Sequence, residues 1–317
     1  MSMPSLVESM GLTPPRERLR QALIAIRGDE DVPPSKFGVS SLRLLDPKLS
    51  VPLWCGRYAV HRQVVLSNLF NHRQTPVELG WSVEKTQVED FRGGASTYDS
   101  HPGTDFCIPR GTLMLAPASG RVVRVVSEFH RGGLKLALDH GDGLITSSAH
   151  LARVLVQEGD LVGRGQPVAV TGYSGLDSLV SFPWGIPHIH FNVWLDGQPV
   201  DPFARASHPE ESSLFVNGWP TTLPEDVDSE EPRDSEYDPD KVAARIEGCI
   251  TASTRERLAK VEPLSRRGGQ LVFETNYYPT RFRDRTSPLR DVHPRRERLH
   301  LPFSASVFDG VVFRDAL

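Results

Sequence analysis

The residues whose types and spacing are best suited to chemistry are four histidines and one aspartate in the middle of the chain. His101 and Asp105 form a His-x-x-x-Asp motif. His188 and His190 form a His-x-His motif, and His150 lies between the two motifs. Imidazole and carboxylate are ligands that zinc accepts, and a catalytic zinc uses three protein ligands and keeps a position for water. The pattern indicates a hydrolytic enzyme with one zinc ion per chain.

The His-x-His pair is expected on a β-strand, where alternate side chains point to the same face. Both imidazoles would then approach one point, while Ile189 and Phe191 would face the other way into apolar packing. A strand can therefore hold a metal ligand beside a catalytic group. Taken alone, His188 and His190 would more often be two surface histidines on an exposed strand.

The other candidate residues carry little weight individually. Pro102-Gly103 disfavours a helix between His101 and Asp105, so we expect a turn that leads into a strand. His150 alone is also compatible with an ordinary polar residue at a strand end. His140 stands in a glycine-containing turn, and we expect it to stabilise that turn by hydrogen bonds rather than to bind metal.

Short strands separated by glycine turns fill the segment around these residues. Glycine turns at this spacing, with no helical pattern between them, are typical of an antiparallel sheet. The predicted strands are 113–115, 120–126, 134–138, 144–147, 168–171 and 189–194, preceded by 64–66 and 81–83.

A helix is predicted near the N-terminus. Thr13 is placed to cap it, prolines follow in the first turn, and Gly28 stands at the end. Leu19, Leu23 and Ile26 would share its apolar face.

The composition changes after Asp201-Pro202-Phe203. Residues 224–240 are acidic and contain proline, so we expect a solvated linker. A calcium loop is the alternative, but the central glycine and terminal glutamate of such a loop are missing. A helix is predicted from 238 to about 260, and strands at 271–273 and 311–313.

The C-terminal part also holds a run of arginines. Acidic residues interrupt the run and aromatic residues do not interleave with it, which favours a solvated or salt-bridged face over a nucleic-acid site. Its members are Arg281, Arg283, Arg285, Arg290, Arg295, Arg296 and Arg298.

The whole chain has 317 residues and a net charge of −4, which gives no general argument for binding nucleic acid or an anionic membrane. Cys55, Cys107 and Cys249 are too widely separated for a metal clip or a disulfide framework. The sequence contains no apolar run that could span a bilayer and begins without the pattern of a secretory signal. We therefore expect a protein that is cytoplasmic or exported to the cell wall by an unconventional route.

The predicted fold class is mainly β, α+β overall, with an antiparallel core sheet. We expect an N-terminal helical or irregular segment at 1–60, the metal-binding sheet domain at 61–205, an acidic linker at 206–240, and a C-terminal extension of helix and strand at 241–317.

Taken together, the motifs resemble the lysostaphin/LytM-type zinc metalloendopeptidases over about residues 96–204. The resemblance rests on the following motifs in order: His101-Pro-Gly-Thr-Asp105-Phe, Pro109-Arg-Gly111-Thr, Ala116-Pro-Ala-Ser-Gly120, His150-Leu, Gly159-Asp-Leu-Val-Gly-Arg-Gly165, Thr171-Gly-Tyr-Ser-Gly175, His188-Ile-His190-Phe and Gly197-Gln-Pro-Val-Asp201-Pro.

The resemblance implies that His101, Asp105 and His190 ligate zinc, whereas His150 and His188 are catalytic. All five positions of the pattern are filled. The sequence departs from the family pattern at two places. Ser147-Ser148-Ala149 stands where relatives often have an aromatic residue, and Asn192 stands where they commonly have glutamate or methionine. Both departures concern the substrate groove rather than the chemistry.

Further expectations concern the groove. Tyr98 is a weaker candidate for contact with the oxyanion. The segment from Tyr173 to Trp184 would border the groove, and Trp184 would either pack or stack on substrate.

The resemblance also implies hydrolysis of peptide bonds in peptidoglycan. The sequence lacks a His-Glu-x-x-His helix, which would supply a glutamate as general base. His150 and His188 would therefore deprotonate the water and protonate the leaving amine. The alternatives are a cytoplasmic zinc peptidase that acts on a non-wall peptide, and a non-catalytic module that binds the wall or regulates another hydrolase. Relatives of the last kind typically lose ligand residues. The expected partner is a peptide or peptidoglycan, with no nucleic acid.

Overall fold

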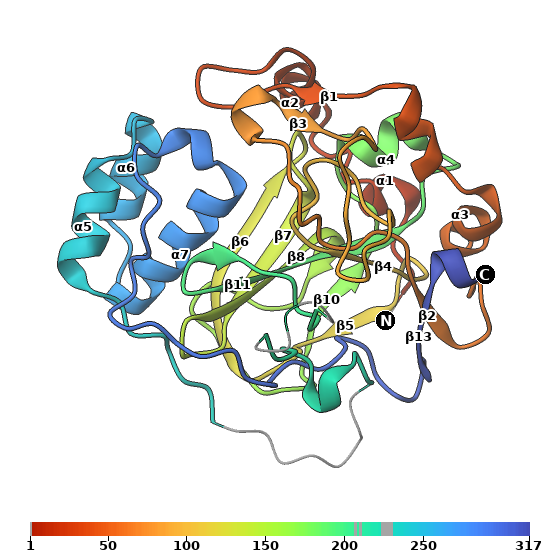
Figure 1. Cartoon of the computed structure of the whole chain (residues 1–317). Helices are drawn as coiled ribbons and strands as arrows, with labels where there is room; N and C mark the ends of the chain where they lie inside the picture. The colour runs from red at the N-terminus through yellow and green to blue at the C-terminus, as the bar shows by residue number, and fades with distance from the viewer. Residues whose placement is uncertain (1, 206–207, 209–210, 223–230) are drawn as a thin grey trace.

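The computed structural model describes residues 2–205, 208, 211–222 and 231–317. Its centre is an eleven-stranded sheet in which the path of paired strands runs β13-β2-β4-β11-β8-β7-β6-β9 (Figure 1). The pairs are antiparallel except β13 with β2. The strands are β2 (Gln63–Leu66), β4 (Thr104–Cys107), β5 (Leu113–Leu115), β6 (Gly120–Glu128), β7 (Gly133–Asp139), β8 (Leu144–Val154), β9 (Leu161–Val162), β10 (Pro167–Thr171), β11 (His188–Leu195), β12 (Gln198–Pro199) and β13 (Gly310–Phe313).

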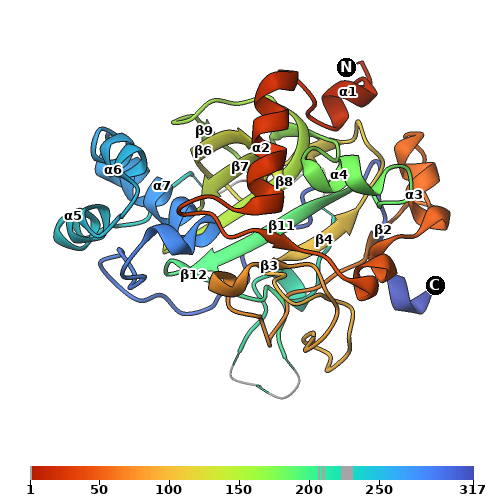
Figure 2. The ribbon, with the colours of Figure 1, turned by 90° about the horizontal axis from the view of Figure 1, so that it is seen from above.

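Helices and a small second sheet surround the large one. Figures 1 and 2 both place α5, α6 and α7 on one side of the molecule, and α3 and α4 on the other. The helices are α1 (Leu6–Ser9), α2 (Pro15–Arg27), α3 (Pro47–Trp54), α4 (Leu176–Ser181), α5 (Pro239–Glu247), α6 (Ala252–Ala259) and α7 (Leu264–Tyr277), and β1 (Ser35–Lys36) pairs in parallel with β3 (Trp81–Ser82). The expected α+β architecture with a mostly antiparallel sheet is confirmed.

The two faces of the sheet bury different cores, and strand alternation explains why. Ile189, Phe191 and Val193 of β11 point into one apolar core and are completely buried. Trp194 points the other way and packs with Phe273 of α7 in a second core. Since side chains alternate along a strand, His188 and His190 lie on the same face as Trp194.

The N-terminal helix is confirmed as α2, but two details of its prediction are wrong. Its N-cap residue is Pro14, without a side-chain cap. Leu19, Leu23 and Ile26 do not pack into a core and are 66%, 43% and 62% exposed.

A polar contact accounts for the orientation of α2. The buried Gln21 accepts a hydrogen bond from the Phe129 N–H at 2.7 Å, so the helix presents Gln21 and Ala25 to the sheet domain instead of its leucines. The spacing of apolar residues predicts which face of a helix is apolar. It does not predict that a polar side chain, here the Gln21 amide, accepts a hydrogen bond from a buried backbone N–H.

The C-terminal part is more helical than predicted. The single helix expected from 238 to about 260 is divided into α5 and α6, which are separated by residues 248–251. Residues 271–273 are not a strand but lie within α7, where all three are buried. A short apolar run does not distinguish a buried helix from a strand, and here the helix occurs. The strand predicted at 311–313 is confirmed as β13.

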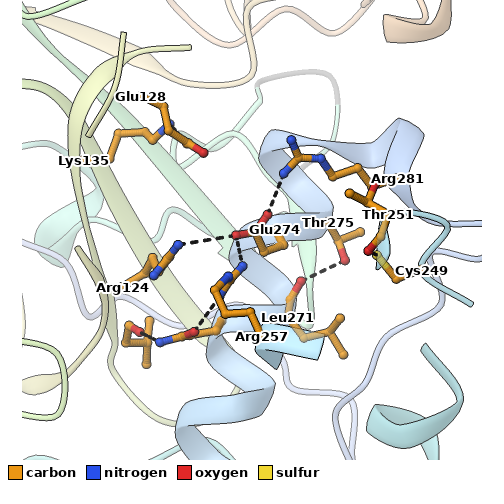
Figure 3. A network of polar contacts seen from close by, with 12 residues as sticks. Arg124, Glu128, Lys135, Cys249, Thr251, Arg257, Leu271, Glu274, Thr275 and Arg281 are labelled. Atoms are coloured by element: carbon orange, nitrogen blue, oxygen red, sulfur yellow. Dashed lines mark hydrogen bonds and ion pairs between the residues drawn. The ribbon is translucent and has the colours of Figure 1, made fainter. Parts of the chain in front are cut away.

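Glu274 of α7 joins the helices to the sheet by ion pairs with three arginines (Figure 3). It is 2% exposed, pairs with Arg257 of α6 and lies 3.2 Å from Arg281. Arg124 of β6 completes the group at 3.8 Å. The carboxylate therefore stands at the junction of α6, α7 and β6.

We expect Glu274→Ala to lower the free energy of unfolding by about 2–4 kcal/mol. Removing one partner of a buried ion pair leaves the other charges uncompensated, and partial solvent access of the arginines moderates the loss. Equilibrium denaturant unfolding followed by circular dichroism measures the change. Glu236→Ala, which removes the exposed pair with Arg290, should cost about 0–1 kcal/mol and is the control. Equal losses in the two variants would contradict the role assigned to Glu274.

The arginine run is largely salt-bridged, as predicted. Arg281, Arg285, Arg290 and Arg298 each pair with a carboxylate from another part of the chain. Part of the predicted acidic linker, including 223–230, lies outside the described residues. Among the residues that are described, no helix has the length and apolar character needed to cross a membrane.

Candidate metal centre and active site

Three adjacent strands bring the predicted residues together. In the register of the sheet, His190 of β11 is opposite Asp105 of β4 on one side and Ala149 of β8 on the other. His101 stands just before β4, and His150 follows Ala149. Cross-strand neighbours project to the same face, so side chains that lie far apart in sequence meet at one point.

His101, Asp105 and His190 form a buried cluster whose ligand atoms could hold a metal ion. His101 Nε2 is 3.0 Å from both Asp105 Oδ1 and His190 Nδ1, and His190 Nδ1 is 2.9 Å from Asp105 Oδ1. Ligand atoms at about 2.0–2.1 Å from a tetrahedral zinc lie about 3.3 Å apart, close to these separations. Small outward movements would accommodate the ion.

The hydrogen bonds around the cluster show why it suits a cation. His101 Nδ1 donates to the Leu69 carbonyl at 2.6 Å, and His190 Nε2 donates to Asn192 Oδ1 at 3.0 Å. In neutral imidazoles these bonds use the single N–H of each ring. His101 Nε2, His190 Nδ1 and an Asp105 oxygen then direct lone pairs at one another. A zinc ion bound by these two histidines and the aspartate would accept all three lone pairs.

Asp105 is itself held in place and ionised. Asn68 donates to Asp105 Oδ2 at 2.8 Å, which leaves Oδ1 facing the two imidazoles. Burial alone would raise the pKa of Asp105, but positive charge on the adjacent His101 and His188, in their protonated forms, holds that pKa well below its ordinary value. The carboxylate is therefore charged at neutral pH, as a metal ligand must be.

His150 and His188 lie beside the cluster as a second pair. Their ring centroids are 4.8 Å apart. His150 Nδ1 donates to the Ser174 carbonyl and His188 Nδ1 donates to the Ile186 carbonyl, both at 2.7 Å. In the neutral form of each ring this bond uses the single N–H, so that Nε2 is an acceptor. His188 Nε2 is 3.6 Å from Asp105 Oδ1.

The backbone at His150 is irregular in a way that positions its ring. His150 has a φ of +62°, which is uncommon for a residue other than glycine. The pairing of β8 shifts register next to it, as in a β-bulge. Burial, with a contribution from His188, lowers the pKa of His150 well below its ordinary value. His150 is therefore neutral at neutral pH, with Nε2 as a hydrogen-bond acceptor.

A pocket of about 490 Å³ opens over these residues. Its walls include residues from the N-terminal segment, such as Phe37 and Leu42, and Tyr277 from α7. Tyr173, Leu176 and Asp177 also line it, so the segment after β10 borders the groove as predicted. Trp184 is 53% exposed.

Two other predictions can be placed. Tyr98 lines the pocket with its ring 4.5 Å from His101, and burial together with Asp105 raises its pKa well above the ordinary value. Its hydroxyl therefore keeps its proton. His140 bonds to the Ser119 carbonyl and to Thr146 Oγ1, at 3.0 and 2.8 Å, as expected for a structural histidine.

Tyr277 lies near the candidate metal ligands and was not predicted from the sequence as part of the site. Its hydroxyl accepts a hydrogen bond from Asn192 Nδ2 at 3.2 Å and lies 3.1 Å from Ser147 Oγ. Asn192 in turn accepts from His190. The departures at Ser147 and Asn192 thus form a chain of hydrogen bonds with α7 that ends on a predicted metal ligand. Tyr277 is too distant in sequence for spacing to reveal this contact.

We expect Asn192→Ala to weaken zinc binding by about 10–100-fold and Tyr277→Phe by up to about tenfold. Groups that hydrogen-bond the distal nitrogen of a ligating histidine fix its tautomer and orientation. Competition with a chromogenic chelator measures the Kd for zinc. Tyr237→Phe, which removes a hydroxyl bonded to Asp139 instead, is the control and should leave the Kd unchanged. Unchanged zinc affinity in Asn192→Ala would contradict this role.

Comparison with known proteins agrees with the geometry. The family model described as Peptidase family M23 matches residues 99–202. The peptidoglycan DD-endopeptidase ShyB of Vibrio cholerae is 36% identical over 117 residues, which are 37% of this chain and 25% of that protein. The murein hydrolase activator NlpD of Escherichia coli is 30% identical over 122 residues, 38% of this chain and 29% of that protein.

Among solved structures, the catalytic domain of lysostaphin from Staphylococcus simulans is 28% identical, with a TM-score of 0.29. The match covers 33% of this chain and 77% of that domain. The chain spans only about a quarter of the length of the first curated relatives. Residues 99–202 are an M23 metallopeptidase domain of the lysostaphin/LytM type, with a buried His-Asp-His site.

Proposed function

We propose that the chain is a zinc-dependent endopeptidase that hydrolyses peptide bonds in the cross-links or stem peptides of peptidoglycan. The observation that carries the proposal is the arrangement of two groups of side chains at one pocket, which Asp105, His150, His188 and His190 line and behind which His101 is buried. Three buried lone-pair donors converge at one point, and beside them His150 and His188 are each oriented by a hydrogen bond from Nδ1 to a backbone carbonyl. This arrangement combines a metal site with proton-transfer groups.

Zinc at His101, Asp105 and His190 would supply a polarised scissile carbonyl and lower the pKa of the attacking water toward neutrality. His150 is neutral and oriented by the Ser174 carbonyl, so it can accept a proton at Nε2. His188 is oriented in the same way by Ile186 and can hold or return a proton to the leaving amine. Positioned donors of this kind also stabilise negative charge that develops on the substrate oxygen.

The substrate is proposed from the family and the relatives. ShyB is described as a peptidoglycan DD-endopeptidase, and the resemblance of this chain to the lysostaphin type implies wall peptides. The similarity to the murein hydrolase activator NlpD supports a second candidate function, that of a module that binds the wall and regulates another hydrolase. The complete set of ligand and catalytic positions favours an enzyme. Action in the cytoplasm or after unconventional export is part of the same proposal.

Dye release from labelled peptidoglycan tests the proposal. Zinc-loaded protein should release soluble fragments, a chelator should abolish release, and added zinc should restore it. A protein that carries stoichiometric zinc and binds sacculi without releasing dye would instead support the regulatory module. Cleavage of a non-wall peptide, with sacculi left intact, would support the cytoplasmic alternative.

A further inference from the structure

Arg131 is a cation in the pocket without an acidic partner in contact. It lines the same pocket as His150, His188 and His190. Across the described part of the chain, no carboxylate oxygen lies within 4.0 Å of its guanidinium, and the guanidinium donates no hydrogen bond. By contrast, the arginines around Glu274 are paired. Asp177 also lines the pocket but makes no ion pair with Arg131 within that distance.

The turn that carries Arg131 is fixed next to the candidate catalytic groups. Gly132 and Gly133 have φ of +71° and +66°, which glycine adopts readily in such a tight connection between β6 and β7. The Gly132 carbonyl accepts from the His150 N–H at 2.8 Å. The completely buried Lys135 donates to the Arg131 carbonyl and to Glu128, both at 2.6 Å. Arg131 is therefore held in place beside His150.

The contacts and charge of the Arg131 side chain suit the binding of a planar anion. Its guanidinium lies over the ring of Trp81, as in a cation–π contact. In general, a guanidinium stacked on an aromatic ring keeps its in-plane N–H groups clear of that ring, so that a carboxylate can accept two of them. Burial lowers the pKa of Arg131 to about 10, so it remains charged at neutral pH.

We propose that Arg131 binds a free carboxylate of the substrate peptide, and that the enzyme thereby selects peptides with a carboxylate close to the scissile bond. The inference rests on the proposed function and narrows its substrate class. Stem peptides of the wall carry free carboxylates, whereas the interior of a glycine bridge carries none. Arg131 is in this account a specificity-determining residue that contacts substrate.

Binding to matched fragments tests the subsite. Muramidase-released peptidoglycan fragments are used either with native carboxylates or after conversion of the carboxylates to methylamides. Isothermal titration calorimetry is performed with the zinc-loaded full chain carrying His188→Ala, in which slowed hydrolysis preserves the fragments during the titration. Amidation should weaken binding by about 10–100-fold, as expected for a lost charge-assisted contact.

The variants decide where the carboxylate binds. Arg131→Gln should weaken binding of native fragments by the same factor and leave binding of amidated fragments unchanged. Arg131→Lys should recover part of the affinity, because it keeps the charge without the bidentate geometry. Arg290→Gln removes an exposed arginine paired with Glu236 and should change nothing.

Each contrary outcome has a separate meaning. If Arg131→Gln weakened the binding of native and amidated fragments equally, Arg131 would have a structural role and the proposed subsite would be wrong. The proposed subsite would also be wrong if the protein with Arg131 intact bound neither fragment. Because hydrolysis is not needed for the readout, a preserved carboxylate preference without cleavage by the wild type would contradict only the proposed function. Cleavage without that preference would contradict only the role of Arg131.

Discussion

We expect the His188→Ala and His150→Ala proteins to retain one zinc ion per chain but to hydrolyse peptidoglycan about 10²–10⁴-fold more slowly than the wild type. Neither imidazole belongs to the buried cluster of His101, Asp105 and His190, so metal binding should survive. Each variant removes one of the two rings whose Nε2 is available for proton transfer. Zinc content by elemental mass spectrometry and rates of fragment release measure the two effects.

Two outcomes would contradict the assignment of these two histidines to catalysis. Loss of zinc from His188→Ala or His150→Ala would overturn it and make the affected residue a ligand. Full activity in both variants would show that proton transfer is carried out by other groups. Circular dichroism of each variant controls for unfolding, which matters most for His150 because its backbone is in the left-handed region.

We expect Asp105→Ala and His101→Ala to weaken zinc binding by more than about 100-fold and to abolish hydrolysis. Loss of a ligand should exceed the 10–100-fold effect of losing a group that only orients one. Asp105 also supplies the negative charge that offsets the cation in a buried site. The Kd from chelator competition measures the effect, with His188→Ala as the histidine control.

Zinc should also stabilise the wild type and fail to stabilise these ligand variants. A ligand that binds only the folded state raises stability by about 2.7 kcal/mol at 100 times its Kd. Thermal unfolding with and without zinc therefore gives a second readout that is independent of activity. An equal rise of Tm in the wild type and Asp105→Ala would contradict the triad as the metal site.

The sheet was predicted from short strands separated by glycine turns, and the metal-ligand set of His101, Asp105 and His190 was predicted from the resemblance of the combined motifs to a known family. His188 and His190 were placed on one face from their spacing, and Ile189 and Phe191 on the other, as the structure shows. Glycine turns marked the limits of the central strands.

Contacts between distant parts of the chain could not be predicted in this way. Tyr277 reaches Asn192 because α7 packs on the sheet, and Arg131 meets Trp81 across separate elements. The orientation of α2 depends on Gln21, a polar residue that periodicity treats as surface. The proposed boundaries at 60, 205 and 240 likewise stay predictions. The pairing of β13 with β2 joins residues 310–313 to the central sheet.

Hydrolysis of peptidoglycan in ¹⁸O-labelled water, analysed by mass spectrometry of the released fragments, tests the central claim most directly. The zinc-loaded wild type should release defined fragments in which each new carboxyl terminus carries one ¹⁸O and each partner fragment ends in a new amine. His188→Ala should release them about 10²–10⁴-fold more slowly. Such products identify both the reaction and the bond. Absence of labelled termini from the wild type, despite bound zinc and bound peptidoglycan, would contradict a zinc endopeptidase acting on the wall.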